Sequence, residues 1–392
     1  MFPGPFLLPL RPSMVGTLGL VGGLLVFPDR VLPGDLWIGE GKILALGPRA
    51  AQGAEATVRV DSLYVAPGFL DVQANGALGY DFLTASPEAI AAILDFFVRH
   101  GTTGVLATLT SAPWAELRAA LERLRAAAHP ALLGVHMEGP FLAAARRGAH
   151  PEEHLLLPSP ALVRSFLSDF PGLVRLWTLA PELPGTEEVL RELRAREVIC
   201  AAGHSDATYE EALRAFSLGI SLVTHLFNGM RPFHHRDPGL VGAALDSDVF
   251  VSLICDGAHV HPAAVRLAAK LKGFDRLLLI SDAVAPTGLP EGVYVLFGEQ
   301  VRVEQGIPRL PDGALAGSTL TLDRAVKNFL EFTGCSLPEA VRCVTLNPAR
   351  LLGIDDRKGS LAVGKDADLV VFDENFTVHY TILGGKIVYA RT

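Results

Sequence analysis

Short apolar runs alternate with amphipathic stretches through the middle of the chain. The runs are long enough for strands but short for helices, which indicates strands buried on both faces of a parallel sheet. Between two of them, residues 87–99 place apolar side chains at i, i+3, i+4, i+7 and i+8, the pattern of an amphipathic helix. Similar patterns cover 114–128, 207–216 and 262–270. The predicted strands lie near 65–71, 104–109, 132–138, 174–180, 198–203, 220–225, 250–255 and 277–281.

This alternation of strands and helices predicts an α/β fold with a parallel sheet, and eight units favour a closed (β/α)8 TIM-like barrel over residues 65–360. Two short β-like segments near 291–311 indicate a β-hairpin inserted before the last barrel helix, which we expect over 319–332.

The two ends of the chain share a different sequence pattern, in which short apolar segments are interrupted by glycine and proline. Neither end is long enough to form a stable sheet alone. We therefore expect residues 17–64 and 361–392 to pair in one small β-sandwich domain beside the barrel. Residues 1–16, rich in proline, are expected to be a flexible tail, and translation could begin at Met1 or Met14.

Composition narrows the class of protein. The formal net charge of −8 argues against a nucleic-acid-binding surface, which would need a basic stripe. The apolar stretch over 14–27 contains four glycines and is too short to span a bilayer. The four cysteines form no C-x-x-C pair, so a reduced cytoplasmic protein without membrane or nucleic-acid partners fits best.

Four predicted strands lead into a residue that can bind a metal or move a proton: Glu138, His204, His225 and Asp282. In a (β/α)8 barrel the carboxyl ends of all strands open onto one mouth, so these distant residues would meet there. One glutamate and two histidines form a zinc set with an open position, and a nearby aspartate can transfer protons. The pattern predicts a metallohydrolase.

Each of these residues also has a structural interpretation. A carboxylate at a strand end can be salt-bridged, a lone histidine is as often structural as ligating, and Asp282 could cap a helix. The functional interpretation depends on three possible ligand residues standing at the ends of the third, fifth and sixth predicted strands.

Several motifs carry a family resemblance. Residues 66–76 (APGFLDVQANG), 347–349 (NPA) and 359–372 (GSLAVGKDADLVVF) resemble the opening and closing motifs of the amidohydrolase superfamily. Within it, HMEGPF, GHSDA, THLFNGM, DGAH and LAGS are similar to motifs of the N-acetylglucosamine-6-phosphate deacetylase family. They stand at residues 136–141, 203–207, 224–230, 256–259 and 315–318.

The resemblance implies a homodimer that hydrolyses the N-acetyl group of N-acetylglucosamine 6-phosphate to give glucosamine 6-phosphate and acetate. It makes Glu138, His204 and His225 metal ligands and Asp282 the catalytic acid and base, and we expect His150 to polarise the substrate carbonyl. It also implies that Arg236 reaches the phosphate in the neighbouring subunit. The implied substrate contacts are Ala149, His150, Asn228, Gly229, Arg236, His259, Leu315, Ala316 and Gly317.

One departure from the superfamily affects the metal. Where many members have His-x-His after the first strand, this chain has Gln73 and Asn75. Carboxamides are poor zinc ligands, so this second metal position is expected to be vestigial. We expect one divalent ion per subunit, zinc by preference, with Fe²⁺, Co²⁺ and Mn²⁺ as alternatives.

Two other functions stay open. One is a related amidohydrolase that acts on another N-acylated sugar phosphate or amide, and the other is a non-catalytic homologue. The sequence does not distinguish the glucosamine, galactosamine and mannosamine epimers.

Overall fold

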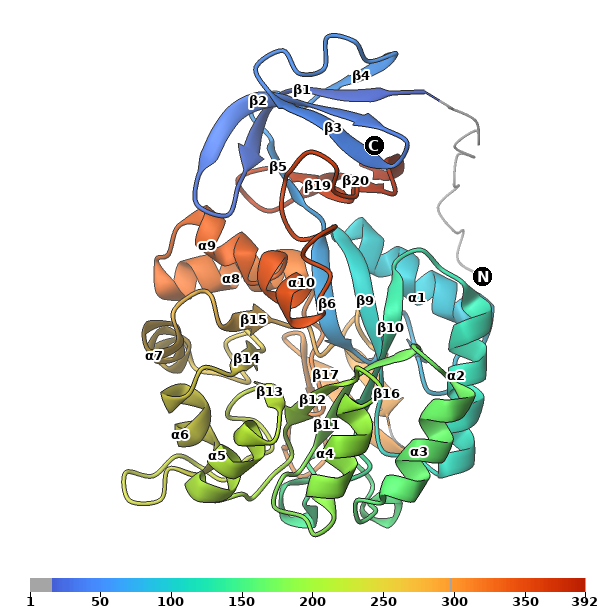
Figure 1. Cartoon of the computed structure of the whole chain (residues 1–392), viewed down its shortest axis with the longest axis vertical. Coiled ribbons are helices and arrows are strands. Elements are labelled where there is room, and N and C mark those ends of the chain that lie inside the picture. Colours follow the sequence, from blue (N-terminus) through green and yellow to red (C-terminus); the bar gives the residue numbers. More distant parts are fainter. Residues whose placement is uncertain (1–15, 297, 392) are drawn as a thin grey trace.

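The computed structural model describes residues 16–296 and 298–391, so almost all of the tail expected over 1–16 lies outside the described residues. Two large sheets organise the chain (Figure 1): a parallel sheet ringed by helices, and a separate β-sheet domain built from both ends of the sequence. The predicted (β/α)8 barrel with a domain formed by the two terminal segments is confirmed.

The barrel sheet has eight strands, and every neighbouring pair in it is parallel. Their sequence order equals their spatial order, as expected when each strand is followed by a helix that crosses back. The strands are β6 (Phe69–Ala74), β9 (Thr102–Leu109), β10 (Leu132–Glu138), β11 (Val174–Leu179), β12 (Ile199–Ala202), β13 (Ile220–Val223), β14 (Phe250–Leu253) and β15 (Leu277–Leu279).

The first and last barrel strands meet only beyond the end of β15. There, Asp282 N–H donates to the Gln73 carbonyl at 2.9 Å, and Asn75 N–H donates to the Ala283 carbonyl at 2.7 Å. Toward the opposite end, the Val344 carbonyl accepts the N–H of Leu70 in β6. The barrel is therefore closed at its mouth by the same short segments that carry candidate site residues.

Helices separate the strands and cover the outside of the barrel (Figure 1). The first begins after Ser86, whose hydroxyl accepts the Ala89 N–H, and has proline at its first position, as helix starts favour. The helices are α1 (Pro87–Arg99), α2 (Trp114–Ala127), α3 (Pro160–Asp169), α4 (Thr186–Arg194), α5 (Tyr209–Ser217), α6 (Gly239–Asp246), α7 (Pro262–Lys272), α8 (Leu322–Thr333), α9 (Leu337–Arg342) and α10 (Leu346–Leu351).

Two predicted elements differ most from their observed bounds. The first strand was expected over 65–71, but Gly68 divides this segment, and β5 (Tyr64–Pro67) before it joins the terminal sheet. The helix expected to begin at residue 319 begins at Leu322 instead. Ser318 is held extended because its N–H donates to the Asp282 carbonyl and its own carbonyl accepts the Val284 N–H.

The terminal domain is one eight-stranded sheet around its own apolar core, which includes Leu20, Leu36, Val65, Leu369 and Ile382. Residues 39–42 form the turn that joins β2 and β3 as an antiparallel hairpin. Besides β5, its strands are β1 (Leu18–Val26), β2 (Val31–Gly39), β3 (Lys42–Gly47), β4 (Ala56–Arg59), β19 (Leu369–Phe372), β20 (Val378–Leu383) and β21 (Lys386–Ala390).

Smaller elements decorate the barrel. The segment expected as a hairpin near 291–311 forms a three-stranded antiparallel sheet. Among residues 16–296 and 298–391, no helix is both long and apolar enough to cross a membrane. The smaller elements are β16 (Gly292–Leu296), β17 (Glu299–Glu304), β18 (Ile307–Arg309), β7 (Gly76–Ala77), β8 (Tyr80–Asp81) and two 3-10 turns, η1 (Ala144–Arg146) and η2 (Glu152–His154).

Gly68 offers a test of how the terminal sheet joins the barrel. A Cβ atom at this position would lie 2.1 Å from the hydroxyl oxygen of buried Thr103. We expect Gly68→Ala to destabilise the protein by about 1–3 kcal/mol through overpacking, measured by denaturant unfolding. Gly292→Ala is the matched control, because its Cβ would approach nothing closer than 3.7 Å. Equal stability of the two variants would contradict the tight junction.

Candidate active site

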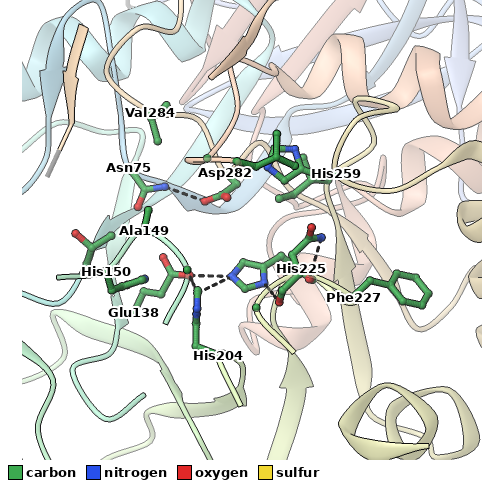
Figure 2. Close-up of a pocket in the computed structure, with 17 residues that line it drawn as sticks. Asn75, Glu138, Ala149, His150, His204, His225, Phe227, His259, Asp282 and Val284 are labelled. Atoms are coloured by element: carbon green, nitrogen blue, oxygen red, sulfur yellow. Dashed lines mark hydrogen bonds and ion pairs between the residues drawn. The ribbon is translucent and has the colours of Figure 1, made fainter. Parts of the chain in front are cut away.

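The four residues singled out from the sequence meet at the mouth of the barrel (Figure 2). Glu138 is the last residue of β10, whereas His204, His225 and Asp282 follow β12, β13 and β15 by two or three positions. These three have left-handed backbone conformations, with φ of 48°, 32° and 47°. Such values are uncommon outside glycine and mark local strain, which functional sites often carry.

Three of these side chains form one compact cluster. The Oε1 atom of Glu138 lies 3.1 Å from Nε2 of His204 and 3.0 Å from Nε2 of His225, and the two Nε2 atoms are 3.1 Å apart. All three side chains are buried, and their ligand atoms meet the distances expected of a metal-binding group.

Backbone carbonyls orient both imidazoles. Nδ1 of His204 lies 3.0 Å from the Arg146 carbonyl, and Nδ1 of His225 lies 3.1 Å from the Asn228 carbonyl. A carbonyl can only accept, so each ring carries a proton on Nδ1 and leaves Nε2 free to bind a metal. Three electron-pair donors thus converge on one buried point, which fits a divalent cation such as zinc.

The charges in the cluster agree with this interpretation. Burial alone would raise the pKa of the Glu138 carboxyl, but His204 and His225 hold that pKa well below its ordinary value. Burial would lower the pKa of His225, yet the hydrogen bond to Glu138 and the charges of Glu138 and Asp282 together outweigh burial and raise that pKa. The cluster therefore attracts positive charge, as a proton or as a metal ion.

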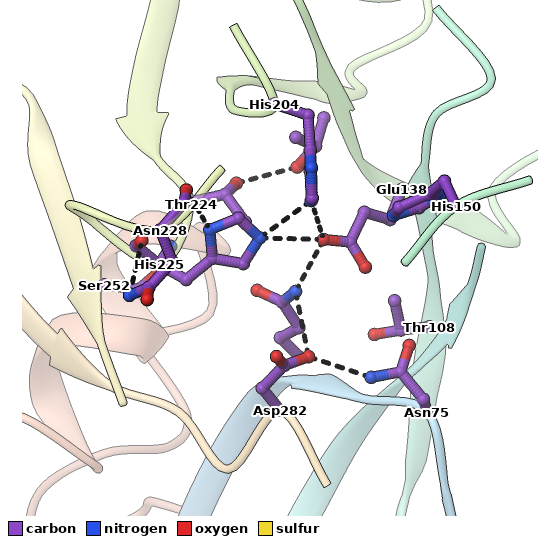
Figure 3. A network of polar contacts seen from close by, with 12 residues as sticks. Asn75, Thr108, Glu138, His150, His204, Thr224, His225, Asn228, Ser252 and Asp282 are labelled. Atoms are coloured by element: carbon purple, nitrogen blue, oxygen red, sulfur yellow. Dashed lines mark hydrogen bonds and ion pairs between the residues drawn. The ribbon is translucent and has the colours of Figure 1, made fainter. Parts of the chain in front are cut away.

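Gln73 and Asn75 turn their amide nitrogens toward the two carboxylates, and Figure 3 shows the bond from Asn75 to Asp282. Gln73 Nε2 donates to Glu138 Oε1 at 3.0 Å and to Asp282 Oδ1 at 3.3 Å. Asn75 Nδ2 donates to the same Asp282 oxygen at 2.9 Å. Instead of two more ligands, this wall of the site presents neutral N–H donors that tie the carboxylates together.

Asp282 is buried beside the cluster and has the properties of a proton carrier. Burial, with the nearby charge of Glu138, raises the pKa of the Asp282 carboxyl to about 6. A carboxyl group with a pKa close to neutrality can both accept and return a proton.

His150 presents an N–H donor to the cavity. Its Nδ1 atom accepts the backbone N–H of Ser111 at 3.2 Å and lies 3.0 Å from the Ser111 hydroxyl. Burial, with the neighbouring His204, lowers the pKa of His150 to about 3, so the ring is neutral. The single ring proton then resides on Nε2, where it can polarise a carbonyl oxygen.

These side chains line a cavity of about 320 Å³. Of the expected substrate contacts, Arg236 and Ala316 do not line it. Arg236 lies in an exposed loop and contacts His235. Ala316 is buried against Val284 and the sheet formed by β16, β17 and β18. The expected contacts that do line it are Ala149, His150, Asn228, Gly229, His259, Leu315 and Gly317.

Two supporting carboxylates were not predicted. Asp256 Oδ2 lies 2.6 Å from Nδ1 of His259 and fixes that ring at the cavity wall, a pairing that the Asp-x-x-His spacing could have indicated. Asp206 accepts from Arg146 at 2.7 Å and from Arg231 at 3.1 Å, joining three barrel loops. Nothing in the sequence indicates that second network, because its partners lie far apart along the chain.

Comparison with known proteins agrees with this geometry. A sequence profile described as the amidohydrolase family matches residues 64–388, and the chain belongs to that family, whose members depend on metal. The chain is 39% identical over 378 residues to N-acetylglucosamine-6-phosphate deacetylase from Bos taurus, covering 91% of each protein. It is 35% identical over 359 residues to N-acetylgalactosamine-6-phosphate deacetylase from Escherichia coli O157:H7, covering 90% of this chain and 94% of that protein.

A solved structure shares the whole architecture. It is a variant of N-acetyl-D-glucosamine-6-phosphate deacetylase from Mycobacterium smegmatis in complex with N-acetyl-D-glucosamine-6-phosphate. The two chains are 33% identical with a TM-score of 0.90, and the match covers 95% of this chain and 100% of the other.

The Asp206 network should influence metal binding from a distance. Arg146 supplies the carbonyl that orients His204, and Asp206 holds the Arg146 side chain. Because outer-shell partners tune metal affinity, we expect Asp206→Asn to weaken zinc binding about tenfold in a chelator-competition titration. The control is Asp237→Asn, which loses only a bond to Arg231 and should bind zinc normally. Equal zinc affinities of Asp206→Asn and the unmodified protein would show that the Asp206 network does not influence the metal site.

Proposed function

We propose that this protein hydrolyses the N-acetyl group of N-acetyl-D-glucosamine 6-phosphate to give D-glucosamine 6-phosphate and acetate. The observation that carries the proposal is the buried cluster of Glu138, His204 and His225 beside Asp282. Deacetylases of this specificity among its relatives support the choice of substrate. The free thiols of all four cysteines fit a reducing compartment, and we propose a cytoplasmic location.

The chemistry follows from the positions of the proton-carrying groups. A divalent cation held by Glu138, His204 and His225 would lower the pKa of a water molecule to about 7. Asp282 removes a proton from the attacking water, whose oxygen bonds to the amide carbon. His150 Nε2–H stabilises the charge that develops on the carbonyl oxygen. Asp282 then returns the proton to the nitrogen as the C–N bond breaks.

We propose that the phosphate binds at the cavity wall around His259. His259 is paired with Asp256, and both His259 and Asn228 line the cavity. A phosphate monoester carries nearly two charges, so charge-assisted donors are required. We propose that Arg236 supplies one from the neighbouring subunit of a homodimer. The support is that its loop is exposed over residues 232–237, with Phe233 57% exposed.

Asp282→Asn tests the assignment of the acid and base. The amide keeps the shape but cannot carry the proton, so we expect turnover of N-acetylglucosamine 6-phosphate to fall by about 10²–10⁴-fold. Substrate binding, measured by calorimetry, should persist. Acetate release at the unmodified rate would refute the role of Asp282.

The metal content tests the cluster. We expect one tightly bound divalent ion per chain, with zinc preferred for its imidazole and carboxylate ligands. Chelation should abolish activity, and one equivalent of zinc should restore it. Two tight ions per chain, measured by elemental analysis, would overturn the interpretation of Gln73 and Asn75.

Recognition of the phosphate gives a further prediction. We expect Arg236→Met to raise the KM for the phosphorylated sugar and to leave kcat largely unchanged. The unphosphorylated sugar should be an equally poor substrate for the variant and for the unmodified enzyme. Sedimentation of both proteins checks that the dimer is retained. Equal rates of the unmodified enzyme on the two sugars would undo the phosphate-site argument.

A second candidate substrate is N-acetylgalactosamine 6-phosphate, favoured by the 35% identical relative that is named for it. The two sugars differ in one hydroxyl configuration, so parallel measurements of kcat/KM decide between them.

A further inference from the structure

A second cavity adjoins the site on the side away from the phosphate wall. Its volume is about 390 Å³, and it shares Asn75, Thr110 and Val284 with the first cavity. Figure 2 places Asn75 and Val284 on the opposite side of the cluster from His259 and Phe227. Thr108 of β9 lines it, and so do Leu83 and Thr84 from the segment after β8 and Ser111 and Ala112 from the loop after β9.

The arrangement of groups around the reacting amide carbon indicates which part of the substrate would enter this cavity. An amide carbon under attack has four substituents: the attacking water, the carbonyl oxygen, the nitrogen with its sugar, and the acyl chain. In the proposed reaction the water would lie at the cluster and the carbonyl oxygen at His150, and the sugar would run from Asp282 toward His259. The remaining direction, for the acyl chain, points to the wall of Asn75 and Thr110.

That wall carries an unused hydrogen-bond acceptor. Asn75 is buried and donates its amide hydrogen to Asp282, which turns its Oδ1 atom away, on the side of Thr108 (Figure 3). Oδ1 has no hydrogen-bond partner among the described residues. A buried acceptor left unpaired is costly, so a ligand that donates to it would be favoured.

We propose that the second cavity receives the acyl chain of the substrate and that this enzyme accepts N-acyl groups larger than acetyl. The favoured class is a short 2-hydroxyacyl group, whose hydroxyl would donate to Asn75 Oδ1. The inference rests on the proposed function and adds no new chemistry: water attacks the carbonyl carbon, the C–N bond breaks, and the products are the amino sugar phosphate and the hydroxy acid.

An isosteric pair of substrates tests the proposal. N-propionyl and N-glycolyl glucosamine 6-phosphate differ only by a methyl or a hydroxyl at the same position. We expect both to retain kcat/KM within about threefold of the N-acetyl substrate. A pocket closed around acetyl would instead cost about 10–200-fold for the added group. Within that range, the kcat/KM of the glycolyl compound should exceed that of the propionyl compound by about threefold, because of its hydrogen bond.

A substitution in the outer wall of the second cavity tests whether that cavity holds the larger acyl groups. Leu83 lines the second cavity but not the first and is half-buried. We expect Leu83→Trp to reduce glycolyl and propionyl turnover at least tenfold while acetyl turnover changes less than twofold. Leu83→Met is the matched control and should retain all three activities.

Each result has a definite meaning. If the unmodified enzyme hydrolyses acetyl but loses tenfold or more on both larger groups, the inference is overturned and the proposed function stands. If it hydrolyses none, both fail. If Leu83→Trp does not fold, the substrate series on the unmodified enzyme still decides.

Discussion

Three buried electron-pair donors that point at one another require a positive charge between them, and the rest of the site is arranged around that requirement. Glu138 Oε1 and two imidazole nitrogens lie within 3.1 Å of one another. The Arg146 and Asn228 carbonyls prevent either ring from turning its protonated nitrogen inward. Gln73 adds a neutral N–H donor to the same Glu138 oxygen.

The same residues close the barrel and build the site. Hydrogen bonds between the Gln73 and Asn75 segment and the residues around Asp282 join the first and last strands. The same segments place two amides and a carboxylate on one wall. An error in closure would therefore displace the proton carrier from the cluster, so folding of the barrel and assembly of the site are coupled.

The sequence predicted the strands and helices that have a clear period, and it predicted that Glu138, His204, His225 and Asp282 would meet at the mouth of the barrel. It could not predict what depends on contacts between distant segments. The division at Gly68 is set by pairing with the C-terminal strands, and the inward N–H of His150 is set by Ser111. The Asp206 network is likewise tertiary. Arg236 lies outside the cavity of its own chain, and a predicted role in another subunit is invisible in one chain's contacts.

The left-handed backbone at His204, His225 and Asp282 has an evolutionary consequence. A glycine would adopt these conformations at less cost, so the fold itself favours losing the functional side chains. Selection for stability and selection for activity then act in opposite directions at the same three positions. A lineage released from the need for catalysis should lose the site early and keep the barrel, because each such loss would relieve strain in the scaffold.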